Sequence, residues 1–161
     1  FCGVDLATGK QVHGKRRLPT ELALHLAIYR SRPEVKAIFQ ARPPWAELVI
    51  NAGLAFKAMF AEFVNDLGRT ATLSAKQSGD AAVAKSAKTH DTLFIAGHGI
   101  LAVGVTMKQA FFRIMVTEDA AKSLFAAVAV GKPRYFTKAQ AAEILGLDAV
   151  KHRTKMVEKV A

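Results

Sequence analysis

The side chains most able to bind a metal ion or move a proton are five histidines and a glutamate that opens an apolar segment. Glu21 and His25 are four residues apart, so a helix would place them on one face. A first-turn carboxylate is stabilised by the helix dipole, so Glu21 can be purely structural. We expect His25 to be a hydrogen-bonded core histidine rather than a catalyst, and His98, between two glycines, is typical of a turn. The other histidines show no ligand spacing: His13, His90 and His152.

Several signatures of nucleotide binding and catalysis are missing. The segment GHGILAVG is not a Walker loop because no Gly-Lys-Ser/Thr follows it, and no G-x-G-x-x-G opens a helix after a strand. The sequence also contains no G-x-S-x-G elbow and no H-E-x-x-H helix. These absences argue against a nucleotide-binding protein and against a serine hydrolase.

The apolar pattern predicts alternating helices and strands that would position these side chains. Thr20 is expected to cap the first helix, and capping boxes at Thr106–Gln109 and Thr137–Gln140 open two later ones. The segment from residue 54 to 68 is ambiguous. Helices are predicted over residues 20–32, 43–53, 78–89, 106–131 and 137–146. Strands are predicted in a hairpin over residues 2–13, and over 35–41, 69–75 and 91–105, the last folded about Gly97-His98-Gly99. This pattern indicates a layered α/β sandwich with a mixed sheet.

Two blocks of sequence carry a family resemblance. LPTELALHLAIYRSRPEVKAIFQARPPWA is followed, after an intervening stretch, by LFIAGHGILAVGVTMKQAFFRIMVTEDAAKSL. Their order and spacing resemble the class II aldolase/adducin family, which includes fuculose-phosphate aldolases and ribulose-phosphate 4-epimerases. The resemblance implies a three-layer α/β/α sandwich with a mixed, mostly antiparallel central sheet. It makes residues 1–161 a single domain, N-terminally incomplete relative to the family.

The resemblance also implies roles for particular residues. The family holds zinc with an H-x-H pair on a strand and a third histidine from a distant turn, while a glutamate moves the proton. By position, Glu21 matches that glutamate, His98 matches the third ligand, and Thr20 retains one hydroxyl for the substrate. Gln40 and Arg42 occupy the H-x-H positions, and neither is a zinc ligand, because an amide is a weak donor and a guanidinium repels the ion. We therefore expect no zinc cofactor here.

The chain is strongly basic, with a formal net charge of +10. Such a charge favours anionic partners, namely phosphorylated metabolites, nucleic acid or an acidic protein. The resemblance further implies self-association, or membership of a larger assembly. A single cysteine and the absence of a signal peptide or membrane-spanning run favour the cytoplasm or an organelle matrix. The candidate basic binding patch comprises Lys15, Arg16, Arg17, Lys151, Arg153 and Lys155.

Two functions follow from these residues. The first is a degenerate aldolase-like domain that has lost its zinc and acts as a non-catalytic binding or structural subunit. The second is a sugar-phosphate aldolase, epimerase or decarboxylase with an altered site. In that case Arg42 would be the electrophile opposite an enediolate and would also contact substrate, while Glu21 moves the proton.

Overall fold

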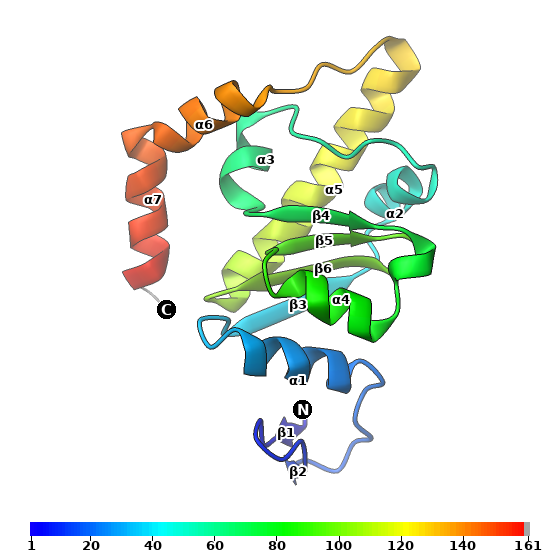
Figure 1. Cartoon of the computed structure of the whole chain (residues 1–161), viewed down its shortest axis with the longest axis vertical. Helices are drawn as coiled ribbons and strands as arrows, with labels where there is room; N and C mark the ends of the chain where they lie inside the picture. Colours follow the sequence, from blue (N-terminus) through cyan, green and yellow to red (C-terminus); the bar gives the residue numbers. More distant parts are fainter. Residues whose placement is uncertain (160–161) are drawn as a thin grey trace.

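The structure is a computed structural model that describes residues 1–159. Its centre is a four-stranded sheet in the order β3-β6-β5-β4 (Figure 1). These strands are β3 (Ala37–Ala41), β4 (Thr70–Leu73), β5 (Thr92–Ile95) and β6 (Gly99–Gly104). β6 pairs antiparallel with both β3 and β5, whereas β4 and β5 are parallel. The predicted mixed, mostly antiparallel sheet is confirmed.

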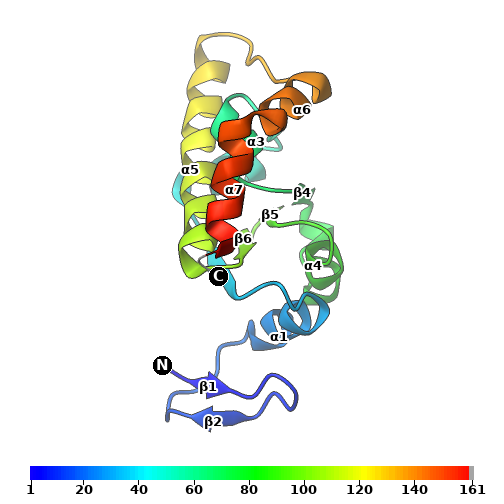
Figure 2. The same cartoon turned by 90° about the vertical axis from the view of Figure 1, so that its left-hand side faces the viewer.

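Helices cover both faces of this sheet. Figure 2 shows α1 (Leu22–Ser31) and α4 (Asp80–Ala87) on one side. The other side carries α2 (Pro44–Asn51), α3 (Ala61–Asp66) and the long α5 (Met107–Val130). The result is a three-layer α/β/α sandwich, as expected from the sequence.

The strands β5 and β6 are buried on both faces because alternate residues point to opposite sides. Leu93 and Leu101 pack in the core with α1 and α4. Phe94 and Ile100 pack in the second core, with α2, α3 and α5. All four side chains are at most 1% exposed. Continuous apolar strands between two helical layers are the arrangement that such burial requires.

The remaining elements lie at the periphery. A hairpin of β1 (Gly3–Val4) and β2 (Gln11–His13) precedes α1, and a short 3-10 turn, η1 (Ala75–Gln77), precedes α4. After α5 the chain forms α6 (Lys138–Gly146) and α7 (Asp148–Lys159), with Val150 of α7 buried. Within residues 1–159 no helix is both long enough and apolar enough to cross a membrane.

Two of the three predicted N-cap residues are confirmed. The Thr106 and Thr137 side chains accept hydrogen bonds from the backbone N–H groups of Gln109 and Gln140, as N-caps do. The prediction that Thr20 caps the first helix was wrong. Glu21 is the N-cap of α1, no side chain caps it, and the Thr20 hydroxyl bonds to the Glu21 carboxylate instead.

Candidate ligand-binding pocket

One large pocket opens at the end of the sheet where β3 and β5 finish. Its volume is about 770 Å³, which is within the range of small-molecule sites. The start of α1, the end of β3, the β5–β6 turn and the segment before α4 all contribute to its wall. It brings together every residue that the sequence placed at the family site: Thr20, Glu21, Gln40, Arg42 and His98.

Glu21 presents an exposed carboxylate at the N-terminus of α1. Its own backbone N–H and then the Thr20 hydroxyl, 2.9 Å from Oε2, hydrogen-bond to it and hold the pKa of Glu21 below its usual range. The nearby His25 and Arg42 side chains act in the same direction. Glu21 is therefore ionised at neutral pH and available as a hydrogen-bond acceptor or a base.

Gln40 is already engaged with a neighbour from another element. Its Oε1 lies 3.2 Å from Nε2 of His25, which reaches across from α1. Both side chains are half-buried and both line the pocket. The expectation of a hydrogen-bonded His25 is confirmed, but His25 belongs to a pocket wall rather than to the core.

Arg42 follows β3 and crosses the β5–β6 turn. A Cβ on Gly99 would lie 2.9 Å from Cγ of Arg42 and 2.3 Å from the Ala41 carbonyl oxygen, so only glycine permits this approach. The Arg42 side chain is 62% exposed, and its guanidinium lies 3.8 Å from the Glu47 carboxylate. This pair is too long for a hydrogen bond, which leaves the guanidinium donors able to bind an anionic group.

His98 is held at the tip of a tight turn. Gly97 and Gly99 on either side adopt positive φ angles of 77° and 87°. The Gly97 N–H donates to Oδ1 of Asn51, at the end of α2, over 2.8 Å, and the His98 N–H donates to the Ile95 carbonyl oxygen. The His98 backbone is fixed by these bonds while its imidazole stays exposed.

Comparison with known proteins identifies the family. The family model described as the class II aldolase and adducin N-terminal domain matches residues 1–125. The chain belongs to the class II aldolase family. The L-fuculose phosphate aldolase of Methanococcus vannielii is 33% identical over 126 residues, which cover 76% of this chain and 67% of that protein.

Other similarities agree with this family. The 5-deoxy-D-ribulose 1-phosphate aldolase of Bacillus thuringiensis serovar kurstaki is 28% identical over 131 residues, which cover 78% of this chain but only 61% of the relative. A solved structure of an L-fuculose 1-phosphate aldolase superimposes with a TM-score of 0.77 and 22% identity, covering 89% of this chain and 69% of that one. This structural likeness shows the same class II aldolase fold.

The pocket residues do not fit the zinc ion that the family implies. A catalytic zinc needs three protein ligands and an open position. Within residues 1–159 no three His, Cys, Asp or Glu side chains come close enough to share a metal ion. At the H-x-H positions stand Gln40, whose oxygen bonds to His25, and the cation Arg42.

Sequence reasoning missed several pocket residues. Ser78 approaches from the segment before α4, Asp80 from the first turn of α4, and Met107 from the first turn of α5. His25 completes this group. Their positions depend on packing between layers, so only the Glu21–His25 spacing was visible in the sequence.

The two halves of the candidate basic patch lie on different elements. Lys15, Arg16 and Arg17 are exposed in the loop after β2, whereas the C-terminal residues belong to α7. In Figures 1 and 2 the β1–β2 hairpin lies below α1, whereas α7 lies higher than α1 and off to one side. In α7, Arg153 lies 3.7 Å from Asp66 and Lys151 lies 3.6 Å from Asp148. Part of the positive charge of α7 is therefore balanced within the chain.

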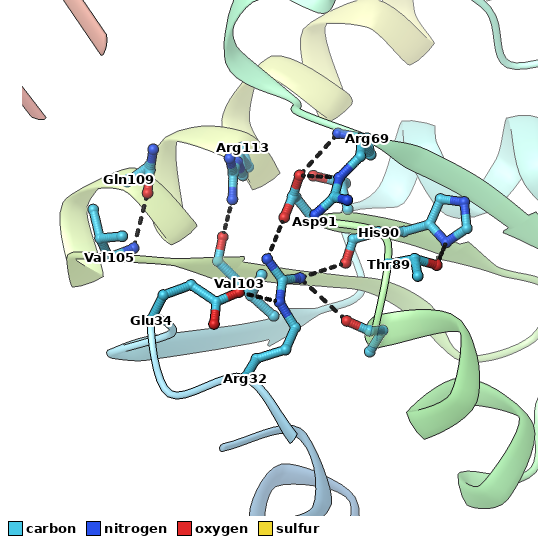
Figure 3. A network of polar contacts seen from close by, with 12 residues as sticks. Arg32, Glu34, Arg69, Thr89, His90, Asp91, Val103, Val105, Gln109 and Arg113 are labelled. Atoms are coloured by element: carbon cyan, nitrogen blue, oxygen red, sulfur yellow. Dashed lines mark hydrogen bonds and ion pairs between the residues drawn. The ribbon is translucent and has the colours of Figure 1, made fainter. Parts of the chain in front are cut away.

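The opposite end of the sheet holds a network of charged side chains (Figure 3). Arg32, only 7% exposed, donates to the carboxylates of Glu34 and Asp91, each over 2.7 Å, and to the carbonyl oxygens of Ala87 and His90. Asp91 also accepts a hydrogen bond from the backbone N–H of Arg69.

Arg113, from α5, lies beside this network (Figure 3). Its guanidinium donates to the backbone carbonyl oxygens of Asp66 and Val103, and burial lowers its pKa. The space left beside this network has a volume of about 120 Å³, far less than the pocket at the other end.

Proposed function

We propose that this chain is a class II aldolase-like domain that has lost the zinc site and acts as a non-catalytic binding or structural subunit. In this proposal the pocket keeps its affinity for a phosphorylated, sugar-like molecule. The observation that carries the proposal is the convergence of Glu21, Arg42 and His98 on one pocket of about 770 Å³.

The polar groups of the pocket suit an anionic, hydroxyl-rich ligand. Arg42 offers guanidinium donors that match phosphate oxygens, and the Thr20 hydroxyl adds a polar contact on the same wall. Glu21 and His98 supply groups that bond to hydroxyls. The two curated relatives are both named as aldolases of sugar phosphates, which supports the same ligand class here.

Loss of zinc is supported by the two residues that stand in place of the H-x-H pair. A cation at position 42 repels a divalent ion, and the amide at position 40 is a weak, neutral donor. A catalytic zinc site needs three protein ligands, and His98 supplies only one.

A second candidate is aldolase, epimerase or decarboxylase chemistry through the altered site. The presence of opposite charges in one pocket favours it, since Glu21 and Arg42 both line the pocket and Arg42 makes a small contribution to the lowered pKa of Glu21. Arg42 would stabilise the developing oxyanion while the Glu21 carboxylate accepts the proton. Turnover of L-fuculose 1-phosphate that disappears in Glu21→Gln would establish this candidate over the non-catalytic one.

Binding and metal content test the first candidate together. Mass spectrometry of the purified chain is expected to find no stoichiometric zinc. Calorimetry is expected to detect binding of L-fuculose 1-phosphate or 5-deoxy-D-ribulose 1-phosphate, weakened roughly tenfold or more by Arg42→Ala through loss of a charge-assisted bond. Arg134→Ala removes an equal charge outside the pocket and is the matched control. One zinc per chain that is lost in His98→Ala, or no binding of either sugar phosphate, contradicts the proposal.

Recruitment into an assembly is a separate part of the proposal. Within residues 1–159, Lys15, Arg16 and Arg17 form no ion pair with an acidic side chain, so this half of the basic patch is more available to a partner than the half on α7. If the partner is nucleic acid, affinity falls steeply with salt, and the slope shrinks when these three residues become alanine. Pull-down of acidic proteins tests the other partner class.

Self-association is supported by apolar side chains left exposed on α2 and α5. Light scattering at micromolar protein measures it, and a monomeric mass counts against it. The exposed side chains are Trp45, Leu48, Phe111, Phe112 and Met115.

A further inference from the structure

The hydrogen bond between His25 and Gln40 places a second polar group in the pocket, on the wall between α1 and β3. The Gln40 amide presents its oxygen Oε1 to His25, and since an amide oxygen can only accept, this arrangement requires the hydrogen on Nε2 of His25. In a neutral imidazole the other nitrogen, Nδ1, is then an acceptor with a free lone pair. Within residues 1–159 no hydrogen bond to Nδ1 of His25 is formed.

An imidazole nitrogen with a free lone pair, such as Nδ1 of His25, can bond only to a ligand group that donates a hydrogen. A phosphate monoester is almost fully ionised at pH ~8, so its oxygens only accept hydrogen bonds and cannot bond to an unprotonated Nδ1, whereas a hydroxyl can. Arg42 has the opposite preference because its guanidinium only donates. The two side chains therefore distinguish the two ends of a molecule that carries both a phosphate and hydroxyl groups.

We propose that His25 is a ligand-binding residue whose Nδ1 accepts a hydrogen bond from a ligand hydroxyl, and that Gln40 is the positioning residue that fixes the imidazole. The inference rests on the proposed function, since it names how the same pocket orients a phosphorylated, polyhydroxylated molecule. It assigns a role to the glutamine that stands where the family pattern has a metal ligand.

The His25–Gln40 bond also connects α1 to β3, so His25 could serve only to stabilise the fold. A structural role and a ligand-binding role predict different effects of substitution. His25→Gln separates the two. A glutamine amide N–H can reach Gln40 from the position of Nε2, but it provides no acceptor where Nδ1 was. Gln40→Leu has the reverse effect, because it removes the tie and leaves the imidazole in place.

Nuclear magnetic resonance of the full chain, labelled with ¹⁵N at histidine, tests the positioning half. The Nε2–H proton of His25 is expected to be protected from exchange at pH ~8, where histidine is neutral. Its signal should disappear in Gln40→Leu and persist in Gln40→Glu, which keeps an acceptor oxygen. A protected signal in Gln40→Leu overturns the positioning role of Gln40.

Titration with L-fuculose 1-phosphate tests the binding half. The Nδ1 resonance of His25 is expected to shift with the sugar phosphate and not with inorganic sulfate, a dianion that carries no O–H donor at pH ~8. His25→Gln should weaken binding roughly fivefold, the effect of one lost neutral hydrogen bond, without lowering the melting temperature.

The possible outcomes separate this inference from the proposed function. If the sugar phosphate binds wild type and His25→Gln equally, or leaves Nδ1 unshifted, the inference fails and the proposed function stands. If neither L-fuculose 1-phosphate nor 5-deoxy-D-ribulose 1-phosphate binds wild type at millimolar concentration, both fail together.

Discussion

The two ends of the central sheet carry polar side chains with opposite surroundings. At the start of β4 and β5, Arg32 is 7% exposed and donates to two carboxylates and two backbone carbonyl oxygens. At the end of β3, the Arg42 side chain is 62% exposed and lies 3.8 Å from its nearest carboxylate. Two arginines of one chain thus differ in how far their hydrogen-bonding capacity is used within the protein.

This difference separates stability from ligand binding. A buried charge with all its partners is costly to disturb, whereas an exposed charge contributes little to folding. Groups left without partners around a large pocket can bond to a ligand without breaking protein contacts. Substitutions at the Arg32 end are therefore expected to destabilise the fold. Substitutions at the Arg42 end are expected to alter ligand binding without unfolding the domain.

The largest expected effect comes from rebuilding the H-x-H pair at the pocket end. Gln40 lies in β3, Arg42 directly follows that strand, and both line the same pocket as His98. In Gln40→His/Arg42→His, three imidazoles can converge, and we expect about one zinc per chain by mass spectrometry. The added change His98→Ala should abolish binding. Failure of the double variant to take up zinc means that more than these two residues separates the pocket from a metal site.

The next largest effect is at the other end of the sheet. Arg32→Ala leaves Asp91, whose side chain is 14% exposed, without the Arg32 guanidinium, and breaking a buried pair costs about 3–5 kcal/mol of unfolding free energy. Arg42→Ala removes an exposed charge and should change stability by less than about 0.5 kcal/mol. Urea denaturation measures both. If Arg32→Ala and Arg42→Ala lower the unfolding free energy equally, the two ends of the sheet do not differ in their contribution to stability.

The pH dependence of stability should reflect Asp91. Burial raises the pKa of Asp91, but hydrogen bonds from the Arg69 backbone and from Arg32 outweigh it, so the pKa is lowered in the folded state. A lowered carboxyl pKa gives stability that is present above the unfolded value of ~3.9 and lost as the pH falls below it.

The variant Asp91→Asn isolates this contribution. Unfolding free energy measured between pH ~2.5 and ~5 is expected to depend less on pH than in wild type, around the unfolded aspartate pKa. Asp119→Asn, on the exposed face of α5, is the matched control. The contribution of Asp91 is obtained from the difference between Asp91→Asn and wild type. Wild-type stability alone would not give it, because burial raises the pKa of Asp66, and the contribution of Asp66 to stability therefore changes with pH in the opposite direction.

The sequence predicted those parts of the molecule that are encoded locally. Capping residues and apolar periodicity located α5 and α6, and two apolar runs about Gly97-His98-Gly99 located β5 and β6. The family resemblance supplied the fold and the pocket positions of Glu21, Gln40, Arg42 and His98. α7 was missed, because half of its residues are charged and its few apolar residues, such as Val150 and Val157, are widely spaced.

Contacts between layers could not be predicted. The His25–Gln40 hydrogen bond joins residues 15 positions apart and depends on how α1 packs on β3. The Arg32–Asp91 pair spans 59 positions and depends on where α1 ends relative to β5. Side-chain partners of this kind are set by the packed fold rather than by local sequence.

The smallest effect concerns the turn that carries His98. Asn51 lies at the end of α2, and its Oδ1 accepts the Gly97 N–H over 2.8 Å. Asn51 is exposed, so water can replace part of the bond, and Asn51→Ala should lower the unfolding free energy by about 1 kcal/mol.

The local consequence of Asn51→Ala should exceed the global one. Hydrogen exchange of the Gly97 amide is expected to accelerate, while amides of β5 keep their protection, because the turn loosens without unfolding the sheet. Asn51→Asp keeps an acceptor oxygen and should restore slow exchange. If Asn51→Ala leaves the Gly97 amide protected, Asn51 does not hold the turn, and the glycine conformations and the contact of Gly99 with Ala41 suffice to place His98.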